Sequence, residues 1–130
     1  MRNADIPSVA ATCSMGTVTG QADGFFGHVP YDSPGVRLRA MSVVVSTEVV
    51  KDPMNFWKLQ VGLWAVGNFQ VLEEVYLQDG VKPSGLRREF QSDPRVPRGA
   101  TIALRAFPVG APAPLEGLSA ALEYGIHGQR

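Results

Sequence analysis

Glycine and proline recur along most of the chain, and the runs between them are short and rich in β-branched residues. The 130 residues include 14 glycines and 10 prolines. Both residue types weaken or break helices, and both are common in turns. No stretch keeps a convincing helical period over a long distance. Short apolar runs separated by turn residues predict an all-β protein, and we expect a jelly-roll-like β-sandwich of five to eight strands.

Length and charge restrict the protein further. A chain of this length fits one domain, and a hydrophobic content of 45% excludes bulk disorder. Twelve basic and twelve acidic residues cancel, which argues against a nucleic-acid partner bound through net positive charge. No apolar run reaches the roughly 18 residues of a membrane span, and we expect neither a membrane partner nor a signal peptide.

Residues 1–35 differ from the rest, because they carry repeated glycine and proline, few charges and no helical period. We expect an extended N-terminal arm here, followed by a β-sandwich domain over residues 36–130. The arm would lie on a surface, with that of a neighbouring subunit as one option and a meander on its own domain as the other. Phe25 and Phe26 would be its apolar anchor.

The central part of the chain predicts strands. Residues 36–50 are β-branched and predict one long bent strand or two strands. Residues 56–66 and 69–77 flank Gly67-Asn68 and predict a β-hairpin with a two-residue loop, in which Trp64 pairs with Val71. One hairpin face is assigned to the core: Trp57, Leu59, Val61, Leu63, Leu72 and Tyr76.

The other hairpin face is too apolar for free solvent, because Trp64, Val66, Phe69 and Val71 gather next to the turn. Two covers are open: another sheet or loop of the same chain, or another subunit. A sugar ring stacked on Trp64 is a third interpretation, but the apolar neighbours favour packing against protein.

The C-terminal third predicts a connection over residues 78–100, with a short strand at 86–90, and then a strand over 101–107. Arg87 and Arg88 begin a group of arginines in this connection, which is either an interface or a solvated run of charge. Residues 118–126 fit a strand or a helix. We favour a strand, because 101–107 needs a partner.

No residues with a recognisable catalytic or metal-binding spacing occur. Cys13 is the only cysteine, and we interpret it as a buried or arm residue rather than a nucleophile. His28 and His127 have no second ligand at metal spacing. Glu73 and Glu74 would point to opposite faces of a strand and make a poor acid–base pair. We therefore expect no enzyme, no cofactor and no metal.

One stretch of the sequence resembles a known protein family: Val96-Pro97-Arg98-Gly99-Ala100-Thr101-Ile102-Ala103-Leu104-Arg105-Ala106. This stretch resembles a segment of β-sandwich structural proteins from tailed-phage virions, in which a Pro/Gly turn enters an alternating strand. The Gly/Pro-rich beginning of the chain is similar to capsid decoration, or cement, proteins. Capsid-surface, baseplate and tail proteins share these sequence features.

The resemblance implies a structural virion subunit that is made in the host cytoplasm and cements a capsid surface by multivalent contacts. Its partners would be copies of itself, for instance in a trimer, and a major capsid or other virion protein. The alternative is a receptor- or glycan-binding module of a tail or cell surface. The residues expected at the partner interface are Phe25, Phe26, Trp64, Val66, Phe69, Val71, Arg87 and Arg88.

Overall fold

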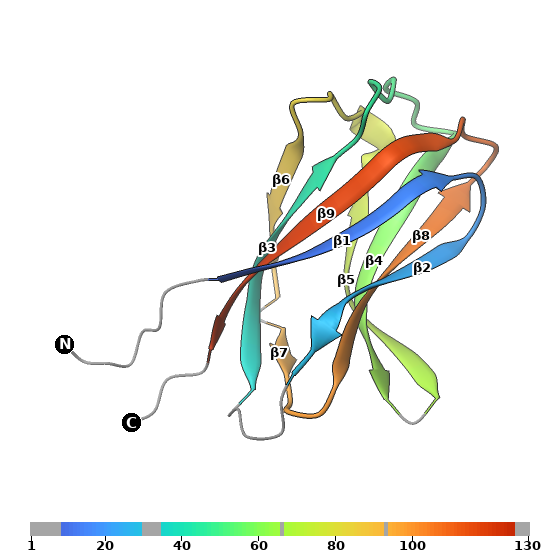
Figure 1. Cartoon of the computed structure of the whole chain (residues 1–130). Helices are drawn as coiled ribbons and strands as arrows, with labels where there is room; N and C mark the ends of the chain where they lie inside the picture. Colours follow the sequence, from blue (N-terminus) through green and yellow to red (C-terminus); the bar gives the residue numbers. More distant parts are fainter. Residues whose placement is uncertain (1–8, 30–34, 66, 93, 127–130) are drawn as a thin grey trace.

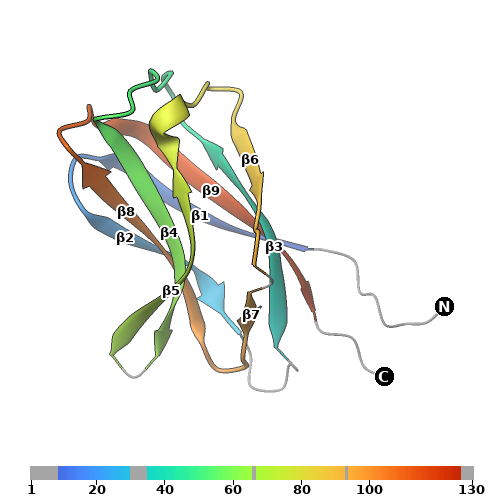
Figure 2. The same cartoon turned by 180° about the vertical axis from the view of Figure 1, so that it is seen from behind.

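Two antiparallel sheets face each other across a single apolar core (Figure 1). The computed structural model describes residues 9–29, 35–65, 67–92 and 94–126. The prediction of an all-β sandwich is confirmed. Figure 2 shows the same sandwich from behind, with the end strands β5 and β6 toward the viewer.

The strands divide between the sheets in an order that alternates along the chain. In sheet order, sheet A contains β1 (Val9–Val18), β9 (Leu115–Ile126), β3 (Val36–Val44) and β6 (Leu86–Glu89), with β7 (Arg95–Val96) also paired to β3. Sheet B contains β2 (Ala22–His28), β8 (Thr101–Val109), β4 (Phe56–Ala65) and β5 (Asn68–Tyr76). A short 3-10 helix, η1 (Leu77–Asp79), follows β5.

The strand pairs are nested. The first strand pairs with the last, β2 pairs with β8, β3 pairs with β6 and β7, and β4 pairs with β5, all antiparallel. Successive pairs belong alternately to sheet A and sheet B. The chain is therefore arranged as one long hairpin that is rolled up, which brings both ends of the described chain into sheet A.

The core follows from the alternation of side chains along each strand. In β4, Trp57, Leu59, Val61 and Leu63 point inward and are buried, as predicted. The indole Nε1 of Trp57 donates a hydrogen bond of 2.8 Å to the carbonyl oxygen of Ala113, so this buried polar atom is satisfied. Burial of so many aliphatic side chains between the sheets is the main stabilising contribution.

The expected N-terminal arm is wrong for residues 9–29. β1 pairs with β9 along its length, β2 pairs with β8, and Val18 and Phe26 are buried in the core. These residues follow the second alternative, a place on their own domain. Residues 1–8 and 30–34 lie outside the described residues.

The glycines that suggested an arm have specific places in the strands. Gly16 and Gly27 have positive φ and stand at register shifts of β1 and β2, where a bulge adds a residue to one strand. Gly24 faces Cys13 so closely that a Cβ there would overlap its sulfur. Glycine inside a strand is therefore a sign of bulges and close contact here, as it is elsewhere.

The strand at the C-terminus confirms one expectation and corrects another. Residues 118–126 form a strand, as favoured, but β9 pairs with β1 and β3 in sheet A. The partners of β8 are β2 and β4. One of these two partners, β2, lies inside the segment predicted to be an arm, and the other, β4, is the first strand of the predicted hairpin.

The central hairpin is present with a different register. Ala65 pairs with Asn68 and Trp64 with Phe69, so each of these β4 residues pairs with a residue two positions earlier in the chain than predicted. The extra residue at the Leu72 bulge then reverses which side chains of β5 point toward the core. As a result Val75 enters the core and Tyr76, predicted to be a core residue, points outward.

Candidate protein–protein interface

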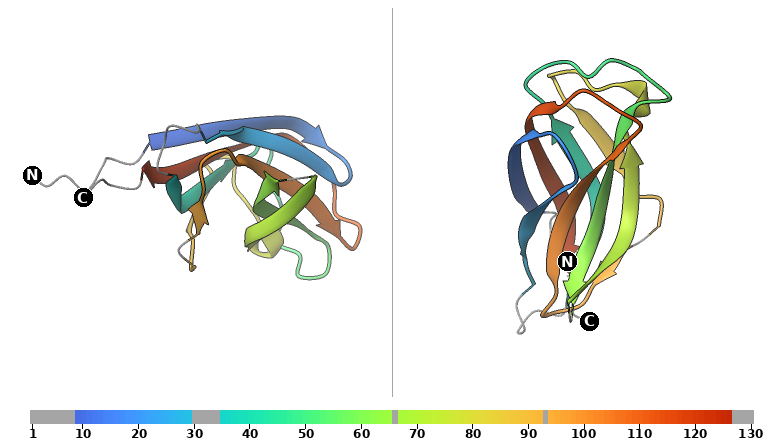
Figure 3. Two further views of the ribbon diagram at one scale, coloured as in Figure 1. Left: turned by 90° about the horizontal axis from the view of Figure 1, so that it is seen from below. Right: turned by 90° about the vertical axis from the view of Figure 1, so that its right-hand side faces the viewer.

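The outer surface of sheet B carries most of the exposed large apolar side chains, and we call it the aromatic face. Seven such side chains are exposed in the described residues, and four belong to this face: Phe25 (57%), Tyr76 (46%), Val71 (41%) and Phe107 (38%). They come from β2, β5 and β8, so the apolar character spans the sheet. Together with β4 these strands form one sheet in the order β2-β8-β4-β5 (Figure 3).

Strand register orders the aromatic face into cross-strand rows, because paired residues share a face. One row runs from Phe25 through Ala103 and Gly62 to Val71, and the next ends with Thr101, Trp64 and Phe69. Two more rows contain the charged side chains: Asp23, Arg105, Gln60 and Glu74, then Phe107, Lys58 and Tyr76.

One end of the aromatic face is organised around Arg105. Its guanidinium donates two hydrogen bonds to Asp23, at 2.9 and 3.4 Å, and this hydrogen bonding raises the pKa of Arg105. The same group lies 4.3 Å from the ring centre of Phe69 and 5.7 Å from that of Trp64. The two rings contact each other at 5.5 Å, so cation and rings form one cluster.

The other end is organised around Lys58 and Glu74. The Lys58 amine lies 5.1 Å from the ring centre of Phe107 and 3.8 Å from Glu74, and Tyr76 packs against Phe56 at 5.8 Å. Hydrogen bonds from Gln60, at 2.7 Å, and Tyr76, at 2.9 Å, lower the pKa of Glu74. The same contact raises the pKa of Tyr76.

The middle of the face consists of small residues that larger neighbouring side chains cover. Gly62 lies under the Phe69 ring, and a Cβ at Gly62 would come within 2.7 Å of that ring. Ala103 is fully buried although it belongs to the outward series of β8. Small residues here allow side chains of the neighbouring strands to lie flat across the sheet.

The predicted interface residues are distributed over three places. Phe25, Trp64, Phe69 and Val71 come together on the aromatic face. Phe26 is a core residue, because adjacent positions in a strand point to opposite sides, and its assignment to a partner interface is wrong. Val66 lies outside the described residues.

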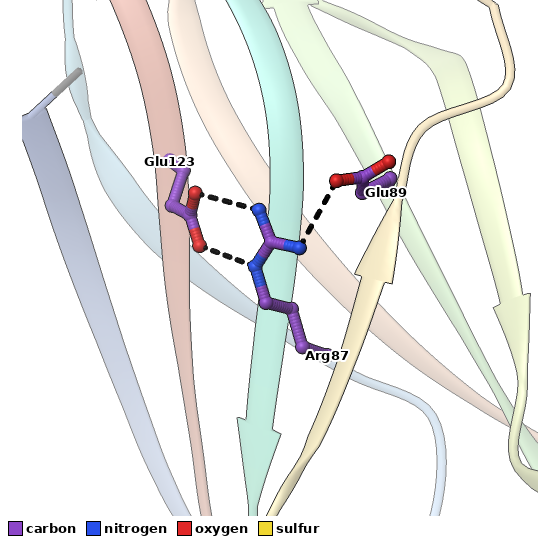
Figure 4. A network of polar contacts seen from close by, with 3 residues as sticks. All are labelled: Arg87, Glu89 and Glu123. Carbon is purple, nitrogen blue, oxygen red and sulfur yellow. Dashed lines mark hydrogen bonds and ion pairs between the residues drawn. The ribbon is translucent and has the colours of Figure 1, made fainter. Parts of the chain in front are cut away.

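Arg87 and Arg88 lie on β6, in the other sheet. Arg87 donates two hydrogen bonds to Glu123 of β9, at 2.8 and 2.9 Å, and a third of 3.2 Å to Glu89 (Figure 4). These contacts lower the pKa of Glu123 and occupy the guanidinium within the chain. We call this three-residue network the arginine clasp. Arg88 is exposed beside β5.

Sequence reasoning missed four contributors to the aromatic face: Lys58 as a ring partner, Tyr76, Arg105 and Phe107. A signal for two of them was present. The alternation of Thr101, Ala103 and Arg105 continues to Phe107, so this outward series of β8 was available from spacing alone. Tyr76 could not be placed, because its facing depends on the bulge at Leu72.

An open groove of about 560 Å³ runs between the edges of β5 and β6. Its carboxylates include Glu73, which accepts hydrogen bonds from the backbone and the hydroxyl of Ser92. Glu74 lies on the outward side with Gln60 and Tyr76. The two acidic neighbours therefore point to opposite sides of β5, as expected.

The other described residues considered as nucleophiles or metal ligands lie in surroundings typical of structural residues. Cys13 is buried, as one of its two interpretations had it, and burial raises the pKa of its thiol. His28 Nδ1 lies 3.2 Å from the Thr101 hydroxyl. The described ranges contain no cluster of three or more potential metal ligands, and no helix in them is long and apolar enough to cross a membrane.

The chain matches no protein-family model, no curated protein and no solved structure. The aromatic face has ring clusters at both ends, each with a paired cation, and small covered residues between them. Trp, Tyr, Phe and Arg are the residue types enriched at protein–protein interfaces.

Proposed function

We propose that this protein is a structural subunit of a virion, which cements or decorates a capsid surface through its aromatic face. The observation that carries the proposal is the concentration of exposed Phe25, Val71, Tyr76 and Phe107 on one sheet. In the described chain no further layer covers this surface. An apolar surface of this extent is typical of a site that binds protein.

The strand order supports the virion assignment. The orders β1-β9-β3-β6 and β2-β8-β4-β5 are those expected when a long hairpin is rolled into a jelly roll, and we infer that the sandwich is of this type. Jelly rolls are common in viral capsid proteins and also in lectins. The protein would be located in the virion, with a major capsid protein as partner.

Cementing requires only modest affinity at each contact. Apolar burial stabilises an interface by about 25 cal/mol per Å² before association costs are subtracted. Copies held in a symmetric array act together, so weak contacts add to a strong attachment. The equal numbers of basic and acidic residues reduce repulsion between neighbouring copies.

The test is co-sedimentation with particles from the cells that make the protein. We expect the wild-type chain in the heavy fraction of a density gradient and the double variant Phe25→Ser, Val71→Ser in the light fraction, with an unchanged melting temperature. Val44→Ser is the matched control, because Val44 is 45% exposed but lies on sheet A. It should stay with the particles.

Two results would overturn the proposal. One is a wild-type chain that never enters a particle fraction, and the other is a double variant that enters it as the wild type does. Saturable quenching of Trp64 fluorescence by oligosaccharides, absent in Trp64→Phe, would favour the glycan-binding alternative instead. The stacked Phe69 and Arg105 leave little of the Trp64 ring for a sugar.

A further inference from the structure

The two sheets end beside each other at β5 and β6, and in the described chain neither strand has a neighbour on its outer edge (Figure 2). Alternate residues of an edge strand turn their backbone N–H and C=O groups away from the sheet, where another strand can pair with them. β6 has four residues, whereas β5 has nine and contains neither lysine nor proline, two residues that commonly protect such edges. The bulge at Leu72 interrupts the β5 edge, and residues 73–76 after it are regularly paired with β4.

The groove between β5 and β6 has an apolar floor that the chain covers only in part. Leu72 of β5 and Phe90, which follows β6, pack against the core and line the groove, but both are only half-buried. Val75 lines the same groove and is buried. Contact of these side chains with water is unfavourable, so a segment lying in the groove would be stabilised by apolar burial.

The walls of the groove are mainly acidic. Four acidic side chains and one basic side chain line it in the described residues: Glu73, Glu74, Asp79, Glu89 and Arg88. Two of the acids pair with cations on the outer faces of the sheets, Glu74 with Lys58 and Glu89 with Arg87. Glu73 instead accepts hydrogen bonds from Ser92, whose donors are neutral and leave the carboxylate charge in place. The groove therefore has an excess of negative charge.

Edge, floor and charge together define the kind of partner. We propose that β5 binds an extended segment of another protein by strand addition, with apolar side chains of that segment over Leu72 and Phe90 and lysine or arginine side chains against the acidic walls. A second copy of β5 suits the edge less well, because the two strands would bring Glu73 and Glu74 of both copies together, and like charges on paired strands repel.

This inference goes beyond the proposed function, because it concerns the edge of sheet B and not its aromatic face. The backbone hydrogen bonds of an added strand would provide affinity, and the alternation of its side chains would provide specificity. A segment in which apolar and basic residues alternate places one kind toward the floor and the other toward solvent and the walls.

A labelled peptide of about seven residues, in which lysine and valine alternate, tests the edge on the full chain. We expect saturable binding by fluorescence anisotropy, with a Kd at or below about 1 mM that rises with salt. Amide hydrogen exchange should slow in β5 and stay unchanged in β1, an edge strand of sheet A. A peptide with proline in place of valine keeps the charge but lacks alternate N–H donors, so it should not bind.

A double variant tests the charge of the walls. Glu73→Gln with Asp79→Asn removes two negative charges, and the glutamine keeps an acceptor for Ser92. We expect binding of the lysine–valine peptide to weaken about threefold to tenfold. The matched control is Glu48→Gln with Glu116→Gln, which removes the same charge outside the groove and should leave binding unchanged.

Four results would overturn strand addition at β5. They are no binding of the lysine–valine peptide, equal binding of the lysine–proline peptide, equal weakening by the two double variants, and slower exchange in β1 without slower exchange in β5. Protection of β5 by self-association of the chain alone would assign the edge to a second copy and overturn the basic partner.

Discussion

On sheet A, Ala40 of β3 lies beneath the Arg87 guanidinium, between Glu123 and Glu89. On sheet B, Gly62 of β4 lies beneath the Phe69 ring. In both sheets a small residue of an inner strand is covered by a long side chain from the neighbouring edge strand. The covering group is an ion network on sheet A and an aromatic ring on sheet B.

The chemistry of the covering group decides what each surface offers. The arginine clasp is surrounded by small or polar side chains, such as Thr12, Ser14, Ser42 and Ala121, and it remains favourable in water. The aromatic face leaves ring surface in contact with water, which is unfavourable until a partner covers it. Sheet A therefore presents a hydrated ion network to solvent, whereas sheet B presents apolar rings that a bound partner would cover.

Of the substitutions considered, one at Gly62, which lies beneath the Phe69 ring, should change the free energy of unfolding most. Gly62→Ala places a methyl group against the Gln70 carbonyl oxygen and the Phe69 ring, so β4 and β5 must separate. We expect a loss of about 2–3 kcal/mol in the free energy of unfolding, measured by urea denaturation. Gly20→Ala, where nothing lies within 4 Å, is the control. Equal effects of both substitutions would contradict the close contact at Gly62.

Removal of the ring itself is the next largest effect. Phe69→Ala deletes the contacts with Trp64 and Arg105, and we expect a cost of about 1–2 kcal/mol. It also uncovers the Trp64 indole, whose emission should shift to longer wavelength, while Trp57 stays buried. A spectrum identical to that of the wild type would show that Phe69 does not cover Trp64.

The arginine clasp should contribute less, because Arg87 and Glu89 are exposed and surface ion pairs are weak. Folding lowers the pKa of Glu123, so its contribution is present above the ordinary glutamate pKa of about 4.3 and is lost as the pH falls through the lowered value. Glu123→Gln should therefore be slightly less stable at neutral pH and depend less on pH below about 4.3. Thermal melts across that range measure both. An unchanged pH dependence would show that the clasp does not stabilise the fold.

The smallest effect on stability is expected from the exposed apolar residues of the two faces. Phe25→Ser and Val44→Ser remove side chains that are already largely in water, so both melting temperatures should stay close to that of the wild type. A large loss with Phe25→Ser would mean that Phe25 packs within its own chain. If both variants are as stable as the wild type, a difference between them in association reflects the face that was changed and not the stability of the fold.

The fold class and the inward faces of several strands could be predicted from the sequence, because alternation such as Trp57, Leu59 and Val61 depends only on local spacing. The position of residues 9–29 within the two sheets could not be predicted in this way. Gly16 and Gly27 interrupt the alternation locally, and only the pairing of β1 and β2 with distant strands shows why. Tyr76 was wrongly predicted to face the core for a similar reason, because the bulge at Leu72 reverses the alternation of the residues after it.

The aromatic face was predictable in part. Trp64, Phe69 and Val71 are close in sequence and were identified together, whereas Phe25, Arg105 and Phe107 join them through strand order. Arg87 was predicted to be a partner-interface residue from its residue type, with a solvated run of charge as the alternative. Its bidentate contact with Glu123 joins β6 and β9 across β3, a relation between distant residues that no local pattern contains.

Hydroxyl-radical footprinting of side chains tests the central claim most directly, because it reads which residues become covered when a partner binds. We compare oxidation of the free chain with oxidation in the assembled particle. The account predicts protection of Phe25, Tyr76 and Phe107, with Val44 and Met54, both exposed in the single chain, oxidised as before. Protection of Val44 without protection of Phe25, Tyr76 and Phe107 would contradict it.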